Sequence, residues 1–233
     1  MKLSIVIPAY NEEGNIANVI NRIEESLDLE YELIVVNDHS QDRTRQKVEE
    51  LALRYNNIKL IDNDLPRGFA NAMKAGFASA RTEVVIPVMG DLCDDLVTIK
   101  KMFAKINEGY DIVCGSRYIK GGARINGSKI KGLFSYFAGW SLQILLGLPT
   151  HDIANAFKMY RKKVIDSIDI HSRGFEISME IPLKAYDQGF KITEVPTVWR
   201  ERTKGKSSFS ILKLLPDYLK LYLWAILKKF TKA

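Results

Sequence analysis

Three acidic residues stand where a metal-bound diphosphate could be held. Asp91, Asp94 and Asp95 lie together in the segment VMGDLCDD, which follows an apolar run. Clustered carboxylates repel one another unless a cation lies between them, and hard oxygen ligands suit Mg²⁺ or Mn²⁺. The same segment could instead begin a helix, with Asp94 or Asp95 as its N-cap. Asp91 precedes that helix and favours the metal interpretation.

A separate acidic residue, Asp38, follows another apolar run in the segment VVNDHS. A carboxylate at this place can accept hydrogen bonds from a ribose or from the edge of a base. Aspartate is also a common turn former, so this residue alone leaves both interpretations open.

Two basic stretches could bind phosphate groups. The first is rich in glycine and suits a flexible loop that closes on phosphates; its basic residues include Arg117, Arg124, Lys129 and Lys131. The second is followed by two serines and contains Arg200, Arg202, Lys204 and Lys206. The hydroxyls and amides of Ser207 and Ser208 would help to hold a phosphate. A solvated basic loop is the alternative for both stretches. The second stretch lacks the aromatic residues of a single-strand groove, so nucleic acid is not favoured.

Alternating apolar runs and helical periodicities would position these side chains. Continuous apolar runs predict buried strands at 3–7, 33–36, 58–61 and 84–88. Helical spacing of apolar residues separates them over 16–27, 48–55 and 69–80. This order indicates an α/β fold, with a mainly parallel central sheet and helices on both faces. Ligands bind at the carboxyl ends of such strands, so we expect the site in loops 8–14, 37–42 and 89–95. The second half is less regular, with a helix predicted at 96–106 and strands at 111–114, 157–160 and 192–195.

The bulk composition limits the class of protein. The chain has 233 residues, is 46% hydrophobic and carries a net charge of +6, which suits one core and an anionic partner. Its two cysteines, Cys93 and Cys114, provide no disulfide framework. The first residues resemble a core strand rather than a signal peptide, and no apolar run reaches the roughly 18 residues of a spanning helix. We therefore expect a cytoplasmic protein that touches a membrane only from its surface.

The C-terminal segment predicts an amphipathic helix. Apolar and aromatic residues from 211 to 226 share one helical face, and lysines lie opposite and at the end. We expect a catalytic domain at 1–207 and a membrane-interfacial extension at 208–233. Packing of this helix against the protein's own core is the alternative. The aromatic segment 133–148 is a second candidate for contact with lipid.

Taken in order, seven segments resemble glycosyltransferase family 2, whose members invert the anomeric centre and have the A-type nucleotide-sugar fold. They are IVIPAYNEE, VVNDHSQDRT, PRGFANAMKAGFASA, VMGDL, GSRY, DIANAF and EVPTVWRERTKGKSSF. The last three resemble the dolichyl- or polyprenyl-phosphate mannose synthase branch. The resemblance covers nearly the whole chain.

The resemblance implies roles for individual residues. The donor nucleotide would contact Pro8, Tyr10, Glu12, Asp38 and Arg67. Asp91 would bind the metal on the diphosphate, with Asp94 and Asp95 as further candidates. The acceptor phosphate would contact Arg117, Lys131, Arg202, Lys206 and Ser207. Asp152 matches an aspartate that precedes the sugar site, and it joins Asp91, Arg117 and Arg202 as a candidate catalytic residue.

The chain also departs from the family pattern. The family's metal motif has two aspartates two positions apart, and Met89 stands in the place of the first. Cys93, Asp94 or Asp95 would then complete the coordination, or metal dependence would be weakened. Asn37 and His39 replace an aspartate and a glycine of the second motif, a change that could move donor choice away from GDP-mannose.

The resemblance implies transfer of a sugar from GDP-mannose or a UDP-hexose to polyprenyl or dolichyl phosphate, with Mg²⁺ or Mn²⁺ as cofactor, at the cytoplasmic face of a membrane. A phosphate acceptor is already an anion and needs no general base. One alternative is a glycan or lipid hydroxyl as acceptor, with Asp152 or Glu176 as base. Another is a non-catalytic nucleotide-binding module docked to a membrane.

Overall fold

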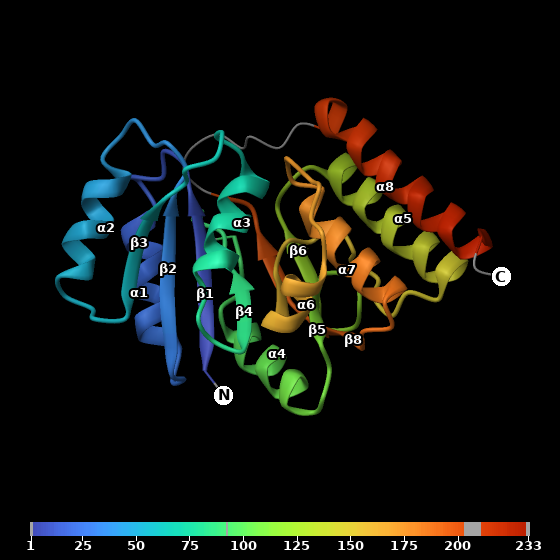
Figure 1. The fold of residues 1–233 in the computed structure, drawn as a ribbon, viewed down its shortest axis with the longest axis horizontal. Coiled ribbons are helices and arrows are strands. Elements are labelled where there is room, and N and C mark those ends of the chain that lie inside the picture. The colour runs from blue at the N-terminus through green and yellow to red at the C-terminus, as the bar shows by residue number, and fades with distance from the viewer. Residues whose placement is uncertain (1, 92, 203–210, 232–233) are drawn as a thin grey trace.

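The computed structural model describes residues 2–91, 93–202 and 211–231. Its centre is a seven-stranded sheet in the order β3-β2-β1-β4-β7-β5-β8 (Figure 1). These strands are β1 (Leu3–Ala9), β2 (Tyr31–Asn37), β3 (Ile58–Asp62), β4 (Val84–Pro87), β5 (Ile112–Ser116), β7 (Lys158–Arg161) and β8 (Ile192–Pro196). All neighbouring strands are parallel except that β7 runs antiparallel to both β4 and β5. The prediction of a mainly parallel sheet is confirmed.

Helices cover both faces of the sheet because successive side chains of each buried strand point to opposite faces. Ile5 and Ile7 of β1 enter one apolar cluster, whereas Val6 enters the other. The first cluster packs against α1 (Ile16–Ser26), α2 (Thr44–Ala52) and α4 (Val97–Asn107). The second packs against α3 (Phe69–Ser79), α5 (Lys129–Leu146), α6 (Lys162–Ser167), α7 (Ile177–Asp187) and α8 (Ile211–Thr231).

One glycine sets how closely a helix approaches the sheet. A Cβ on Gly76 of α3 would lie 2.2 Å from Cγ1 of Val6, a distance that real Cβ atoms do not show. Glycine therefore lets α3 pack directly on β1 and β2.

A second, two-stranded sheet joins the basic stretches to the acidic loop. Strand β6 (Ala123–Ile125) pairs in parallel with β9 (Val198–Arg200), and the amide of Arg200 donates to the carbonyl of Cys93 at 3.1 Å. We did not predict these strands, because a run of three residues is too short to show a strand pattern. Their pairing places the chain after β9 beside the loop after β4.

The long helices α5 and α8 lie side by side at one end of the molecule (Figure 1). The Tyr222 hydroxyl of α8 contacts the Ser141 hydroxyl of α5 at 3.0 Å, and Lys228 pairs with Asp187 of α7 at 3.0 Å. Ala225 is buried in the same core cluster as α7. The alternative prediction, that the C-terminal helix packs on the core, therefore holds for one of its faces.

The opposite faces of these two helices are exposed and apolar. On α8 the exposed side chains include Leu219, Leu223 and Leu227, and on α5 they include Leu133, Phe134 and Phe137. No helix in the described ranges combines the length and the apolarity needed to cross a bilayer. The predicted boundary between 207 and 208 falls outside the described residues, so the division into 1–207 and 208–233 stays a prediction.

Candidate active site

An arginine and two carboxylates meet where the chain leaves β1, β4 and β9. Nη2 of Arg202 donates to both carboxylate oxygens of Glu12, at 2.7 and 2.9 Å, and Nη1 lies 4.0 Å from Oδ2 of Asp91. The three side chains are 13–16% exposed. Burial opposes the charge on Arg202, but the hydrogen bonds and charge of Glu12 outweigh it and raise the pKa of Arg202. A charged guanidinium is thus fixed at the edge of the sheet where ligands bind.

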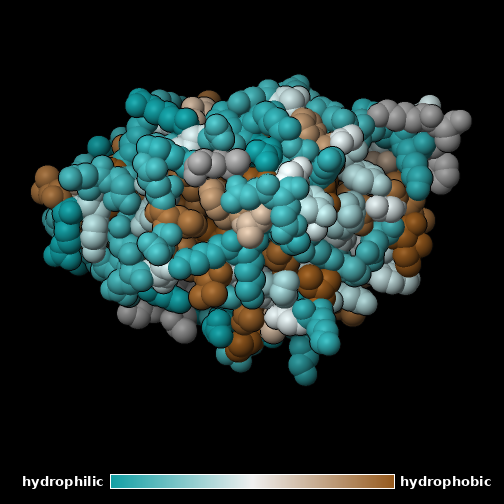
Figure 2. All heavy atoms as spheres, turned by 90° about the horizontal axis from the view of Figure 1, so that it is seen from below, coloured by the Kyte–Doolittle hydropathy of each residue, from teal (hydrophilic) through white to brown (hydrophobic). Residues whose placement is uncertain are grey.

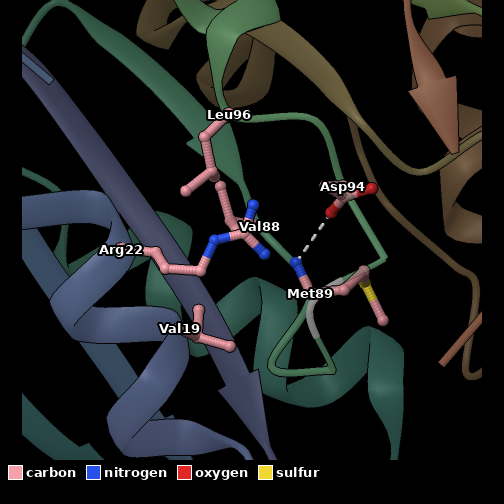
Figure 3. A pocket seen from close by; sticks show the side chains of 6 residues that line it. All are labelled: Val19, Arg22, Val88, Met89, Asp94 and Leu96. Carbon is pink, nitrogen blue, oxygen red and sulfur yellow. Dashed lines mark hydrogen bonds between the residues drawn. The ribbon is translucent and has the colours of Figure 1, made fainter. Parts of the chain in front are cut away.

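The carboxyls of Asp94 and Asp95 accept hydrogen bonds from their own loop and from the start of the next helix. Oδ2 of Asp94 accepts a hydrogen bond from the amide of Met89 at 2.9 Å, so its carboxyl turns back into the loop (Figure 3). Burial raises the pKa of Asp94 to about 7. Oδ2 of Asp95 accepts from the hydroxyl of Thr98 in the first turn of α4, at 3.2 Å. The N-cap of α4 is Leu96, without a side-chain cap hydrogen bond, so the alternative prediction of an N-cap at Asp94 or Asp95 is wrong.

The donor set around Asp91 fits a protein-held hard cation poorly. Within the described ranges, His, Cys, Asp and Glu form no group of three or more that could hold a metal ion. Cys93 donates its amide to Oδ1 of Asp91 at 3.1 Å, and burial, followed by the charge of Asp91, raises the pKa of its thiol. A protonated thiol and the thioether of Met89 are soft groups that suit Mg²⁺ or Mn²⁺ badly. Asp91 lies beside Arg202 at the edge of the sheet where ligands bind, and it stays the first candidate ligand of the predicted metal set.

A second group of predicted residues lies on the loops after β1 and β2. The guanidinium of Arg67 lies 4.5 Å from the centre of the Tyr10 ring, and both side chains are exposed. Asp38 is 5% exposed and accepts from Nδ2 of Asn63 at 2.7 Å and from the amide of Gly68 at 3.0 Å. Asp38 thereby fixes the loop that carries Arg67. Pro8 is half-buried at the end of the β1–β2 ladder.

The two departures in the second motif make contacts of their own. Nδ2 of Asn37 donates to Asp62 at 2.8 Å, and Nε2 of His39 lies 2.8 Å from the carbonyl of Leu65. His39 has φ of 62°, a conformation that favours the glycine usual at this place. Both residues therefore shape the loop between β3 and α3, on the side of Arg67 and Tyr10.

Arg117 and Asp152 form a buried, two-point ion pair. Nε and Nη2 of Arg117 donate to the two oxygens of Asp152 at 2.6 and 2.7 Å, and the amide of Arg117 donates to the same carboxylate at 3.0 Å. The Asp152 side chain is fully buried and that of Arg117 is 10% exposed. Burial alone would lower the pKa of Arg117, but the charge of Asp152 raises it. The pair matches the strong, geometrically fixed arginine–carboxylate arrangement.

The rest of the predicted acceptor set is Lys131, Lys206 and Ser207. Lys131 is half-buried in the first turn of α5, where its amide donates to the Ser128 hydroxyl at 3.4 Å. Lys206 and Ser207 lie outside the described residues. Their assignment to the acceptor phosphate stays a prediction.

Two residues that support this site were missed from the sequence. Ser135 of α5 accepts a hydrogen bond from Nη2 of Arg117 at 3.0 Å. Lys158 is fully buried and donates to the carbonyls of Ile153, Asn155 and Ser178, and so fixes the segment that follows Asp152. Burial lowers the pKa of Lys158 to about 8. Neither residue stands in a pattern that distinguishes it from other serines of a helix or lysines of a strand.

Comparison with known proteins identifies relatives of this chain by sequence. The family model of glycosyl transferase family 2 matches residues 4–169. The chain is 34% identical over 232 residues to a dolichol-phosphate mannosyltransferase of Pyrococcus furiosus, covering 96% of this chain and 64% of that protein. It is 27% identical to a polyprenol monophosphomannose synthase of Mycolicibacterium smegmatis, covering 98% of this chain and 89% of that one. The chain therefore spans just under two thirds of the length of the Pyrococcus relative.

The fold is similar to that of solved glycosyltransferases. A glucosyl-3-phosphoglycerate synthase of Mycobacterium tuberculosis, solved with Mn²⁺, UDP and glucosyl-3-phosphoglycerate, superposes with a TM-score of 0.74 at 18% identity, covering 97% of this chain and 80% of that chain. The same enzyme has been solved with Mg²⁺ and UDP. Structural neighbours of this fold thus hold a divalent metal together with a nucleotide. On the strength of the family model, the chain belongs to glycosyltransferase family 2.

Proposed function

We propose that this chain transfers a sugar, with inversion, from a nucleoside-diphosphate donor to a polyprenyl phosphate. The observation that carries the proposal is the place of Arg117. Its guanidinium is fixed by Asp152 and contacts Ser135 of α5, the helix whose outer face is exposed and apolar. A phosphate-binding arginine at the base of a lipid-facing helix suits an acceptor that has an anionic head and an apolar tail.

The state of Asp152 supports a phosphate rather than a hydroxyl as acceptor. A hydroxyl would require a general base, and Asp152 was one candidate for that role. Its two oxygens receive three hydrogen bonds from Arg117, and its side chain is fully buried. A phosphate is already an anion at neutral pH and needs no proton removed.

The donor would lie along the loops after β1, β2 and β4. Tyr10 and Arg67 are exposed for contact with the nucleotide, and Asp38 fixes the loop that carries Arg67. Arg202 provides positive charge beside Asp91, where the diphosphate is expected. A Mg²⁺ or Mn²⁺ ion would have Asp91 as its ligand from this chain and would neutralise charge on the diphosphate. One carboxylate is a weak donor set for such an ion, so the side chains of Arg117 and Arg202 carry the proposed reaction.

In the proposed reaction an oxygen of the acceptor phosphate attacks the anomeric carbon from the side opposite the diphosphate. The bond between that carbon and the diphosphate oxygen breaks, and the nucleoside diphosphate leaves with the electron pair. Arg117 orients the attacking phosphate, and Arg202 stabilises the charge that develops on the leaving group. Attack in line inverts the anomeric configuration.

The outer face of α5 and α8 would dock on a bilayer surface. Its exposed apolar side chains are Ile130, Leu133, Phe134, Phe137, Trp140, Ile144, Leu145, Leu219, Leu223 and Leu227. Figure 2 shows apolar atoms at the edge of the molecule near the end of α5 and α8, within a largely polar surface. Lys129 and Lys220, both exposed, suit anionic headgroups. We propose peripheral attachment at the cytoplasmic face.

A donor screen tests the proposal. The full chain is incubated with polyprenyl phosphate in detergent and with radiolabelled GDP-mannose, UDP-glucose or other UDP-hexoses. We expect one donor to give a lipid-extractable sugar, with one nucleoside diphosphate released for each sugar transferred. Release of nucleotide without a lipid-linked product from any donor would contradict the acceptor, and no release from any donor would contradict the transferase.

A further inference from the structure

We infer that Arg202 is the resident cation of the donor-diphosphate site, so that nucleotide binding by this chain does not depend on a divalent metal. The inference rests on the proposed function, because it concerns the same donor. It concerns what neutralises the diphosphate, a task that the family pattern gives to a metal held by two aspartates.

In the part of the chain that the structure describes, no cluster of His, Cys, Asp or Glu could hold such a metal. Met89 stands at the position of the first aspartate. The substitutes that the sequence offers suit a metal poorly: the thiol of Cys93 is held protonated by burial, the carboxyl of Asp94 accepts from the amide of Met89, and that of Asp95 accepts from the hydroxyl of Thr98. One carboxylate from the protein leaves most positions around a six-coordinate cation to water and the donor itself.

Arg202 lies where a cation would be needed. Its guanidinium is held by Glu12 through Nη2, while Nη1 is 4.0 Å from Asp91, close enough for attraction but longer than a hydrogen bond. Glu12 follows β1 and Asp91 follows β4, so the guanidinium is placed between the loops of two adjacent strands. A planar guanidinium binds two phosphate oxygens at once, which a diphosphate can supply.

The backbone fixes this placement. The β6–β9 ladder ends at Arg200, and the amide of Arg200 donates to the carbonyl of Cys93 at 3.1 Å. The amide of Glu201 donates to the carbonyl of Ile125 at 3.1 Å. Arg202 therefore enters the site from a strand that is already attached to the loop of Asp91, and its position does not depend on a long flexible reach.

Methionine in place of aspartate at position 89 also lowers the negative charge that a cation must balance at this site. An aspartate there would add a second negative charge beside Asp91, and a divalent ion would be required to balance both against a diphosphate. With methionine, the site has one charge fewer to balance. Arg67, whose guanidinium lies over Tyr10 on the same edge of the sheet, adds a second cation on the donor side.

Calorimetric titration of GDP and of UDP into the full chain tests the inference. Titrations are run in EDTA and in MnCl₂, on the wild type and on Arg202→Met. Arg200→Met, an exposed arginine two positions away, is the matched control. We expect one nucleotide to bind with an affinity that EDTA changes less than about threefold. Arg202→Met should weaken that binding by about tenfold or more in EDTA, and Arg200→Met should leave it within about twofold.

A second variant keeps Arg202 and restores the missing aspartate. Met89→Asp should weaken nucleotide binding in EDTA, because it adds a negative charge beside the diphosphate, and Mn²⁺ should restore it. Binding of Mn²⁺ itself, followed by loss of the free-ion signal in electron paramagnetic resonance, should be stronger in Met89→Asp than in the wild type. This variant keeps the test decisive if Arg202→Met does not fold.

The outcomes separate the inference from the function on which it rests. Nucleotide binding by the wild type that is lost in EDTA and restored by Mn²⁺ overturns the inference and leaves the proposed transferase standing. No binding of either nucleotide, with or without Mn²⁺, contradicts the proposed function as well. Binding in EDTA that requires Arg202 supports both.

Discussion

Arg117 and Asp152, separated by 35 positions in the chain, are joined by two side-chain hydrogen bonds of 2.6 and 2.7 Å in a site from which water is almost excluded. The pair links the end of β5 to the segment before β7. The pair stabilises the fold, and in the proposed function its arginine binds the acceptor phosphate. Substitutions on its two sides should therefore have different effects.

Asp152→Ala should destabilise the protein by about 3–5 kcal/mol, because it leaves the guanidinium of Arg117 buried without its carboxylate. Urea denaturation followed by circular dichroism measures the change. Asp166→Ala is the control, since Asp166 pairs with Lys162 at the surface and should cost no more than about 1 kcal/mol. Equal losses of stability in the two variants would show that the buried ion pair contributes no more than the exposed one.

Arg117→Lys should reduce transfer to polyprenyl phosphate by about 100-fold while nucleotide binding stays unchanged. Lysine keeps the positive charge but cannot make the two-point contact with Asp152 that orients the acceptor. Transfer rates and calorimetric titration of the nucleotide measure the two effects separately. A parallel loss of nucleotide binding would move Arg117 from the acceptor to the donor.

Replacing apolar residues on the outer face of α5 and α8 should release the protein from membranes. Phe134→Ser with Leu223→Ser should weaken binding to anionic vesicles by about tenfold for each residue, since each buries apolar area worth roughly 1.5–3 kcal/mol. Sedimentation with vesicles of phosphatidylglycerol and phosphatidylcholine measures the binding. Leu53→Ser, which alters an exposed leucine just beyond α2, should change nothing. Vesicle binding that survives the double substitution would contradict the docking face.

Glu180 should make the stability of the protein fall at low pH. Its carboxylate is 1% exposed and accepts from Lys184 and from the amides of His171 and Ser172; although burial opposes the charge, these hydrogen bonds lower the pKa of Glu180. A lowered pKa gives stability that is present above the ordinary value near 4.5 and is lost as the pH falls through the folded value.

Glu180→Gln removes that dependence. The difference in free energy of unfolding between wild type and Glu180→Gln should be largest at neutral pH and should shrink as the pH drops below about 4.5. Urea denaturation at a series of pH values measures it. Glu108→Gln, in an exposed pair with Lys105, serves as the control. A difference that stays constant across the series would contradict the assignment.

The strands and the fold class could be predicted from the sequence because apolar runs and helical periodicity are local signals. The sequence also selected Asp91, Arg117 and Arg202 as residues able to carry the chemistry. It did not show that Arg202 pairs with Glu12, 190 positions earlier, because that contact depends on two three-residue strands that are too short to show a pattern.

The roles of Asp94 and Asp95 could not be decided from their types. A carboxylate after a strand suits a cation and a backbone amide equally, and only the tertiary structure turns Asp94 back to the amide of Met89. Lys158 is the opposite case. A lysine in a strand is expected at the surface, and here three carbonyls receive its ammonium group inside the core.

The most direct test of the central claim compares two acceptors that differ only in their heads. The wild-type chain, with the donor found by the screen, is given either a polyprenyl phosphate or the polyprenol of the same length. The proposed function predicts a lipid-linked sugar with the phosphate alone, in the anomeric configuration opposite to that of the donor. Equal transfer to the alcohol, or a product with the anomeric configuration retained, would contradict it.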